Sequence, residues 1–337
     1  MQITNAAKTR NSPGKKPGLI GWLLLAPMVI WLLAFVVAPT GILLVASFTS
    51  AHEDTGFPVY NQPQPPTFGA ANYKRIVVDD EGKLFATEEE DVVQADANGE
   101  DQIVGTKKVT RFAAPYLRVF GYSLLYAGIA TFLCIIIGYP VAWYIGRAKE
   151  STRNLLLMAV MIPFWTSFLI RTYAWVTILA EEGLLNGMLQ YSRFTTEPFQ
   201  MLYTPAAVVL GLVYNYLPFM ILPIYGSVEK LDNSLVEAAF DLGAGPVRAF
   251  QRVILPLTRP GIVAGIMLVF VPAVGMFAIS SLMGGGKSPM IGDVISNQFF
   301  AGRDWPFGSA LGMTLVLMFV GAFIATSRLR KAAGESE

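Results

Sequence analysis

The chain has 337 residues, of which 53% are hydrophobic and 15% are charged, and its formal net charge at pH 7 is +1. Average soluble proteins have about 25% charged residues, so this composition excludes a water-soluble domain of this length and indicates an integral membrane protein. The single cysteine, Cys134, excludes a disulfide bond within the chain. We expect no nucleic acid among its partners.

Six apolar segments are long enough to cross a bilayer, which takes about 20 helical residues. They lie at approximately 19–48, 116–146, 154–180, 203–228, 261–283 and 307–327. Several contain prolines, and in lipid the carbonyl groups that a proline frees must be satisfied by neighbouring helices. The sequence therefore predicts an all-α membrane protein whose six helices pack as a bundle.

Basic residues predict the orientation of these helices. The first segment is longer than the apolar part of a signal peptide, about 7–15 residues, so we expect it to be retained. Lysine and arginine concentrate in alternate short loops, which the positive-inside rule assigns to the cytoplasm. We therefore expect both termini in the cytoplasm and a multi-pass protein of the cell inner membrane. The cytoplasmic group is Arg147, Lys149, Arg153, Lys230, Arg248, Arg252, Arg259, Arg328, Arg330 and Lys331, and the external loops keep Arg193, Lys287 and Arg303.

A long polar insertion follows the first predicted helix, at 49–113, on the external side. It begins rich in proline and becomes acidic between Asp79 and Asp101. The segments 92–94 and 103–104 flank Asn98-Gly99, a pair typical of tight turns, and predict a short β-hairpin. We interpret the insertion as a solvated addition to the outer surface; the alternative is an acidic funnel that concentrates cations or contacts a delivery protein.

A polar stretch, EAAFDLGAGPVRAFQRVILP at 237–256, separates the fourth and fifth predicted spans. The residues 231–234 offer several N-caps for a short helix of about two turns. We expect Glu237 near the N-terminus of this helix, where the helix dipole favours a carboxylate. Gly243 is expected at its end, where a left-handed residue is favoured.

A second short helix is predicted after this turn. Gly245 and Pro246 restart the chain, and proline is well suited to the first position of a helix. We expect Pro256 and Pro260 to end the loop before the next span. Three apolar residues fall on one stripe of the second helix: Val247, Phe250 and Val253.

Two further features, a glycine-rich run and a histidine, could suggest an enzyme, but neither meets the requirements of a catalytic or nucleotide-binding motif. The run 284–288, GGGKS, resembles part of a phosphate-binding loop, yet the pattern needs a glycine where Ser281 stands and a strand before it. We interpret these glycines as a tight turn in an outer loop. His52, the only histidine, lies in the insertion, so we expect no metal site and no catalytic residues.

The spacing of the polar stretch resembles the EAA loop of ABC importer permeases, with Val253 where the family pattern has isoleucine. In that family the loop is where the membrane subunit docks on its ATPase. The resemblance implies that the loop, at about 229–260, couples to an ATPase. The residues assigned to this role are Glu237, Ala238, Ala239, Asp241, Leu242, Gly243, Ala244, Val253, Leu255 and Pro256.

Other segments look like the spermidine/putrescine branch of these permeases, and the match covers nearly all of 116–320. They are 163–168 (PFWTSF), 171–175 (RTYAW), 183–186 (GLLN), 217–220 (LPFM), 282–299 (LMGGGKSPMIGDVISNQF) and 303–308 (RDWPFG). The insertion at 49–113 is longer than expected for the family. The resemblance implies a six-helix type I importer permease with an N-terminal tail at 1–18, a first helix at 19–48, a core at 114–328 and a C-terminal tail at 329–337.

The same resemblance implies the partners and the energy source. An ATPase dimer, a second homologous permease and an external substrate-binding protein are expected beside membrane lipid. This chain itself would bind no cofactor, since ATP and Mg are used by the ATPase. The predicted spans contain no Asp or Glu, whereas carriers driven by protons or sodium usually keep acidic residues inside the membrane. The sequence therefore argues against a secondary transporter.

A polyamine is a cation, and we hypothesise that it crosses a path lined by aromatic faces, carbonyls and amides. The candidates in the third and fourth spans are Trp165, Tyr173, Trp175, Tyr214 and Asn215, with Tyr216 beside them. The alternative is that each is an interfacial anchor or a packing residue. Arg171 would repel a cation, so we expect it to reach the outer surface or to pair with Glu181 or Glu182.

Other functions stay open from the sequence. The chain could be a permease for another small solute of the same group, such as ferric iron, thiamine or an opine. It could also be an ATP-independent channel, or a membrane scaffold that binds the ATPase and passes no solute. Two small-xxx-small pairs, Gly261–Gly265 and Gly308–Gly312, permit close helix contacts either within the subunit or against a second permease.

Overall fold

The computed structural model describes residues 19–50, 67–78, 85–95, 101–112, 115–193 and 195–332. The N-terminal tail at 1–18, His52, the Asn98-Gly99 turn and residues 333–337 lie outside these ranges. In the described part, five helices are long and apolar enough to cross a membrane, or six spans if one bent pair counts as a single span. The five are Leu25–Ser47, Tyr116–Arg147, Pro205–Glu229, Pro246–Val274 and Trp305–Ala325.

The first span is a composite helix that runs beside the last one. It joins α1 (Leu19–Leu32), a π-helical turn η1 (Leu33–Val37) and α2 (Ala38–Ser47). Pro39 lies in the first turn of α2 and has no N–H group to bond to the preceding turn, which fits a widened turn at this place. α2 packs against α14 (Trp305–Ala332), while none of the most apolar window of the first span is buried.

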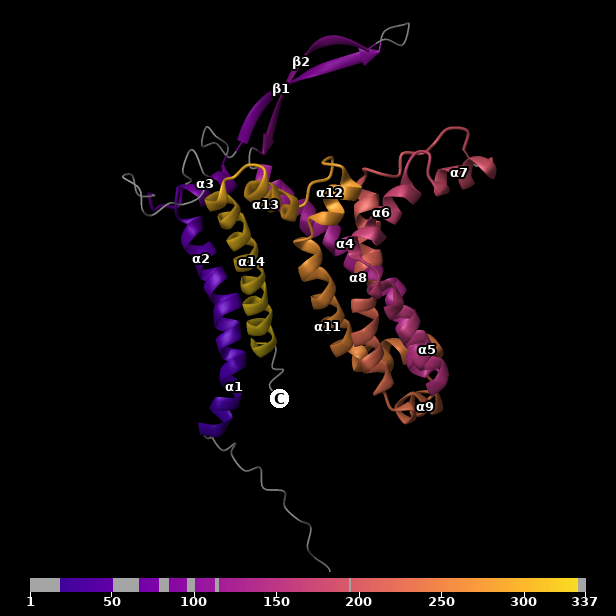
Figure 1. The fold of residues 1–337 in the computed structure, drawn as a ribbon. Helices are drawn as coiled ribbons and strands as arrows, with labels where there is room; N and C mark the ends of the chain where they lie inside the picture. Colours follow the sequence, from indigo (N-terminus) through magenta and orange to yellow (C-terminus); the bar gives the residue numbers. More distant parts are fainter. Residues whose placement is uncertain are drawn as a thin grey trace, which may run out of the picture.

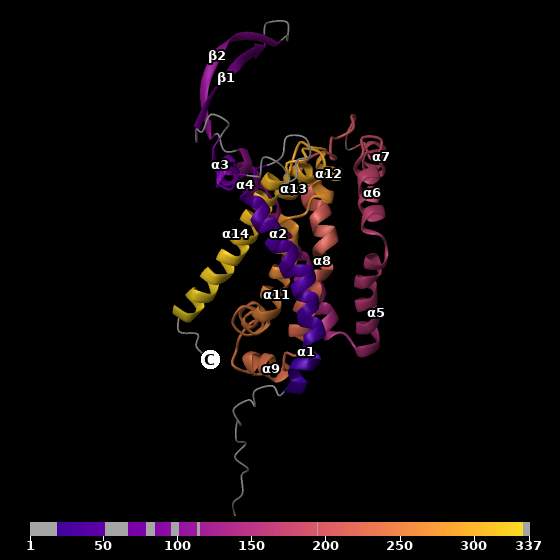
Figure 2. The same cartoon turned by 60° about the vertical axis from the view of Figure 1, so that its left-hand side comes forward.

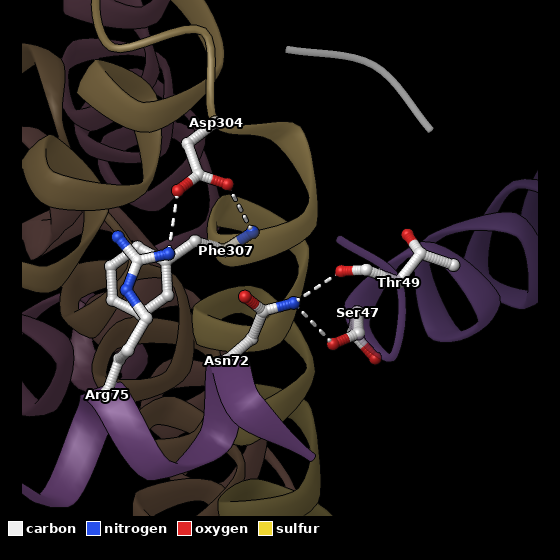
Figure 3. Close-up of polar contacts among 6 residues, drawn as sticks. All are labelled: Ser47, Thr49, Asn72, Arg75, Asp304 and Phe307. Atoms are coloured by element: carbon white, nitrogen blue, oxygen red, sulfur yellow. Dashed lines mark hydrogen bonds and ion pairs between the residues drawn. The ribbon is translucent and has the colours of Figure 1, made fainter. Parts of the chain in front are cut away.

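A cluster of polar contacts ties the top of the first span to the start of α14 through the short helix α3 (Ala71–Val77) (Figure 3). The Asn72 amide donates to the carbonyls of Ser47 and Thr49, at 3.0 and 2.8 Å, at the C-terminal end of α2. The Arg75 guanidinium lies 2.8 Å from the Asp304 carboxylate and 4.1 Å from the centroid of the Phe307 ring. We call this cluster the α3 clasp.

The insertion forms an antiparallel hairpin of β1 (Phe85–Ala95) and β2 (Asp101–Phe112). Val93 pairs with Ile103 and Gln94 with Gln102, so the predicted hairpin is confirmed, with longer strands than expected. A register shift between Val92 and Val93 marks a bulge in the ladder. The hairpin rises away from the helices on the side where α3 and α4 (Pro115–Arg147) begin (Figure 1).

The core of the molecule is α8 (Pro205–Glu229), which packs against α4 and α11 (Leu255–Val274). A side chain at Gly261 would collide with Ser227 and the Pro223 carbonyl, and one at Gly265 would lie 2.6 Å from Met220 Sδ. The Gly261–Gly265 pair therefore serves packing within the subunit, which answers the question that the sequence left open. Nothing lies within 4 Å of a side chain built at Gly312.

The third predicted span is broken, which corrects the continuous helix expected at 154–180. It consists of α5 (Glu150–Met161), the 3-10 turn η2 (Ile162–Trp165) and α6 (Phe168–Leu179), and α7 (Leu184–Tyr191) follows. The two halves, 150–165 and 168–191, meet at 88°. Pro163 has no N–H group for the helical ladder, and Thr166 and Ser167 have extended ψ angles of 150° and 133°.

The fifth predicted span at 261–283 also needs correction at both ends. Its helix begins in the loop, with α10 (Pro246–Ala249) and a π-helical turn η3 (Phe250–Ile254), and continues without interruption as α11. α11 ends at Val274, and α12 (Ala278–Gly284) and α13 (Ile291–Phe300) are separate helices. Gly285 and Gly286 have φ angles of +56° and +77°, so the glycine run forms the turn predicted for it.

The helices present two distinct ends (Figures 1 and 2). The loop end holds the start of α1, the α4–α5 junction, α9 (Asn233–Asp241) and the end of α14. The hairpin end holds the β-hairpin together with α7, α12 and α13.

We predict that Gly265→Val destabilises the subunit by about 1–3 kcal/mol, because the new side chain overpacks the α8–α11 contact. Gly312→Val is the matched control, since it brings the same change in helix propensity at a position with open space. The measurement is the thermal unfolding midpoint of each purified variant in detergent. Equal midpoints for the two variants would contradict this account of the core.

Candidate functional site

The helix α9 forms the protruding part of the predicted coupling loop, and Asp232 begins it. The Asp232 carboxylate accepts a hydrogen bond from the Ser234 backbone N–H at 2.9 Å, which satisfies one of the free donors of the first turn. This hydrogen bond also lowers the pKa of the Asp232 carboxyl below its usual value. Because the helix starts at Asn233, Glu237 lies in its second turn, so the expected interaction of Glu237 with the helix N-terminus is wrong.

The end of α9 is fixed by Gly243, as the sequence predicts. Gly243 has φ +79°, in the left-handed region. The Ala244 N–H donates to the Ala239 carbonyl at 3.0 Å and the Gly243 N–H to the Phe240 carbonyl at 2.9 Å. This is the pair of bonds of a Schellman motif, which satisfies the last carbonyls of a helix. The turn between the two loop helices is therefore a defined structure.

The second half of the loop is continuous with the fifth span, which corrects the prediction of a separate short helix. Pro256 lies in the first turn of α11 directly after the π-helical turn η3, and Pro260 lies inside α11. Neither proline ends the loop, because the wide turn accommodates the missing N–H of Pro256 as η1 does for Pro39.

Tyr139 of α4 braces this continuous helix and was not predicted from the sequence. Its ring meets the Phe250 ring edge-on at 5.5 Å between centroids, and its hydroxyl lies 3.0 Å from the Thr258 Oγ1. These contacts pack the continuous helix of the loop against α4. The apolar stripe predicted with Phe250 is incomplete, because Val247 is 69% exposed.

Several apolar side chains of α9 and α10 have no cover in the isolated chain. Leu242 at the turn is 89% exposed, and Leu235, Phe240 and Val247 are exposed as well. Contiguous apolar surface on a protruding element typically marks a protein interface. Leu235 and Phe240 were not selected from the sequence, although apolar residues in a polar loop are the signal that would find them.

The predicted coupling residues divide into two groups in the structure. Ala239 is buried, and Ala244, Val253 and Leu255 are half-buried, so these residues hold the loop to the bundle. The others are exposed: Glu237, Ala238, Asp241, Leu242, Gly243 and Pro256. A groove of 570 Å³ adjoins α9 at the ends of α8 and α11 and includes Lys230, Asp232 and Leu257 in its lining.

Only some of the residues predicted to line the substrate path lie close together in the structure. The Trp175 ring of α6 meets the Tyr214 ring of α8 edge-on at 5.4 Å between centroids. Asn215 is 6% exposed and donates its amide to the Gly211 carbonyl in the same helix at 2.9 Å. Trp165 and Tyr173, in contrast, are 80% and 55% exposed beside the break of the third span. Their side chains face whatever surrounds the subunit.

Arg171 is half-buried and lies beside aromatic rings. Its guanidinium carbon is 5.2 Å from the Phe164 ring centroid and 5.9 Å from that of Tyr214. Its Nε and Nη1 are buried and have no hydrogen-bond partner. Within the described ranges Arg171 forms no ion pair with Glu181 or Glu182, so the expected pairing is wrong.

The free-energy cost of placing Arg171 in a membrane helix is only partly compensated in the isolated subunit. A cation over an aromatic ring gains about 0.5–2 kcal/mol, whereas insertion of an arginine at the middle of a membrane helix costs about 2.5–3.5 kcal/mol on a biological scale. The two rings therefore offset part of the cost and leave two N–H groups unsatisfied. Phe164 was not among the predicted pathway residues; it lies in the PFWTSF segment just before the break.

The region of this chain that matches known proteins includes both the coupling-loop residues and the aromatic residues. The family of binding-protein-dependent transport system inner membrane components matches residues 115–331. The spermidine/putrescine transport system permease protein PotB of Escherichia coli K12 is 48% identical over 210 residues, which is 62% of this chain and 76% of that protein. PotB of Haemophilus influenzae is 49% identical over 210 residues, or 62% and 73% of the two chains.

Solved structures show the same fold. A chain from the crystal structure of a bacterial ABC transporter involved in the import of the acidic polysaccharide alginate aligns with a TM-score of 0.61 and 18% identity, over 92% of this chain and 96% of that chain. The complex of such a transporter with an alginate pentasaccharide-bound periplasmic protein gives a TM-score of 0.64 and 15% identity, over 94% and 96%. The ABC importer permease predicted from the sequence is confirmed: this chain belongs to the family of binding-protein-dependent transport system inner membrane components.

Proposed function

We propose that this chain is the permease subunit of an ATP-driven importer of polyamines, of which spermidine and putrescine are the expected substrates. The observation on which the coupling role rests is the protruding helix α9: Leu242, directly after this helix, is exposed, while the loop behind it is braced on α4 and α11. The identity of 48–49% to PotB proteins supports the choice of substrate.

The loop would transmit force from an ATPase dimer to the membrane helices. ATP and Mg are used by those ATPases, and this chain would contribute docking and movement only. The short helix α9 is capped at Asp232 and closed at Gly243, so it moves as a unit. Because α10, η3 and α11 are continuous, a push on α9 would tilt the fifth span.

The remaining partners follow from the surfaces that the chain leaves open. The first span buries none of its most apolar window, which supports contact with lipid and with a second, homologous permease. An external substrate-binding protein would deliver the polyamine at the hairpin end; a chain of the same fold was solved in complex with a periplasmic protein. The loop end would face the cytoplasm, with both termini there, because Lys230, Arg248 and Arg252 belong to it.

The proposed path for the polyamine passes the aromatic residues at the break of the third span. Trp165 and Tyr173 are exposed there, and Trp175 and Tyr214 are in contact with each other. Ring faces attract ammonium groups, which suits a substrate with several amines. Carbonyl groups at the break, where Thr166 and Ser167 leave the helical ladder, would add acceptors.

The decisive test is uptake by the complete transporter in proteoliposomes, with radiolabelled spermidine and the loaded binding protein outside. We expect accumulation only when ATP is enclosed with the ATPase. Uptake without ATP would identify a channel, and ATPase binding without any uptake would identify a scaffold. Uptake of a different small solute in the same vesicles, with spermidine ignored, would refute the polyamine assignment but keep the importer.

We predict that Gly243→Val weakens ATPase docking, whereas Gly245→Val has little effect. Both positions have open space for a side chain, but only Gly243 has a positive φ. A left-handed conformation costs about 1–2 kcal/mol for other residues, so affinity for the ATPase should fall by about five- to thirtyfold. The measurement is the amount of ATPase that co-purifies with each variant in a titration. Equal losses in both variants would contradict the role of the turn.

We predict that Trp165→Leu and Tyr173→Leu slow ATP-driven spermidine uptake while the complex still assembles, because each removes an exposed ring from the proposed path. Tyr191→Leu is the control, since Tyr191 is also exposed but lies at the end of α7. Initial uptake rates over a range of spermidine concentrations are compared in vesicles with equal protein. Unchanged rates in both path variants would remove these residues from the path.

A further inference from the structure

Arg171 has a feature that the proposed transport cycle does not yet use. Of the charged side chains that the structure describes, it is the one whose buried nitrogens, Nε and Nη1, find no hydrogen-bond partner. It lies in the first turn of α6, directly after the break of the third span. Its guanidinium is held between the rings of Phe164 and Tyr214.

The position of Arg171 along the membrane is given by its neighbour Tyr214. Tyr214 is the tenth residue of the 25-residue helix α8, which is about 14 Å from the start of that helix at 1.5 Å per residue. Arg171 therefore lies well away from both ends of α8, with its Nε and Nη1 buried and the residue as a whole half-buried. The described carboxylates form no ion pair with it, so its charge is not neutralised locally.

Of the two rings beside Arg171, that of Tyr214 belongs to the proposed path, and that of Phe164 lies directly before the break of the third span. Tyr214 is in contact with Trp175, and Phe164 is in contact with Phe219. Aromatic faces attract any cation, without regard to its identity. A path lined in this way would also attract the inorganic cations that an inside-negative membrane potential draws inward, so it needs an element that repels them.

We propose that Arg171 is the charge barrier of this path: its tethered guanidinium occupies the rings of Phe164 and Tyr214 and excludes inorganic cations while no polyamine is being moved. In the low dielectric of the bundle an unpaired positive charge repels other cations strongly. The ammonium groups of a polyamine take the place of the guanidinium on the rings. Arg171 is released readily, because two of its N–H groups leave no hydrogen bond behind.

This inference rests on the proposed function, and its test uses a readout that does not depend on spermidine. The complete transporter is reconstituted in sealed vesicles without ATP, and the flux of radiolabelled rubidium ions is measured. We expect no flux for the wild type and for Arg171→Lys, and a several-fold rise above protein-free vesicles for Arg171→Gln and Arg171→Cys. Arg153→Cys is the control, an arginine of the same bent pair that lies in an ion pair with Glu229.

The chemistry of the introduced thiol separates charge from size. The single natural cysteine, Cys134, is buried in α4, so within this chain thiol reagents report on position 171. A methanethiosulfonate that attaches a quaternary ammonium group should stop the rubidium flux of Arg171→Cys. A neutral reagent of similar size should leave the flux unchanged. Equal closure by both reagents would mean a steric plug and would overturn the proposal.

Two further outcomes decide the remaining cases. If Arg171→Gln assembles and its vesicles stay tight to rubidium, the barrier is refuted. If the Arg171 variants do not assemble, Phe164→Leu takes their place. Loss of the ring that holds the guanidinium should also raise the rubidium flux, and vesicles that stay tight to rubidium would then refute the proposal.

ATP-driven spermidine uptake is measured in the same vesicles. A charge-dependent rubidium flux without spermidine uptake would refute the polyamine assignment but would keep the role of Arg171 as a charge barrier.

Discussion

Close contact between α8 and α11 depends on two positions without side chains, Gly261 and Gly265, where any larger residue would meet Met220, Ser227 or the Pro223 carbonyl. α8 is also the most enclosed span, with 61% of its apolar window buried against 28–39% for the other buried spans. The loop that bears α9 leaves from α8 and returns as α11. Both ends of the loop are therefore attached to helices that pack closely against each other.

Few charged residues lie in the spans, and two arginines there, Arg153 and Arg171, have different surroundings. Arg153 and Glu229 form an ion pair that joins α5 to the end of α8 beside the loop, where partial exposure limits what the pair adds to stability. Arg171 has rings for neighbours in place of a carboxylate. A structural cation would be expected to find an acceptor, since an unsatisfied buried donor is destabilising. An arrangement that tolerates this cost is typical of a site shaped by function.

Most of the fold could be predicted from the sequence because apolar length and loop charge are local properties. The Schellman turn at Gly243 and the hairpin strands around Val93 and Ile103 were predicted on the same basis. The break after Pro163 could not be, because prolines inside α4, α8 and α11 do not break those helices. Which proline ends a helix depends on packing that no short segment encodes. The ring contact of Tyr139 with Phe250 joins segments far apart in the chain, and for that reason it was missed. The continuity of η3 with α11 was missed because Pro256 was expected to end the loop.

The α3 clasp joins Arg75 to Asp304, residues that lie 229 positions apart. Asp304 has a second task, because its other oxygen accepts the Phe307 N–H at 3.1 Å and so begins α14. Both helices that flank the hairpin in sequence, α3 and α4, are in contact with each other, and α3 also rests on α14 (Figure 3). The base of the hairpin is consequently connected, through α3, to both the first and the last transmembrane segments. A force applied to the hairpin from outside would therefore act on the hairpin ends of both transmembrane segments at once.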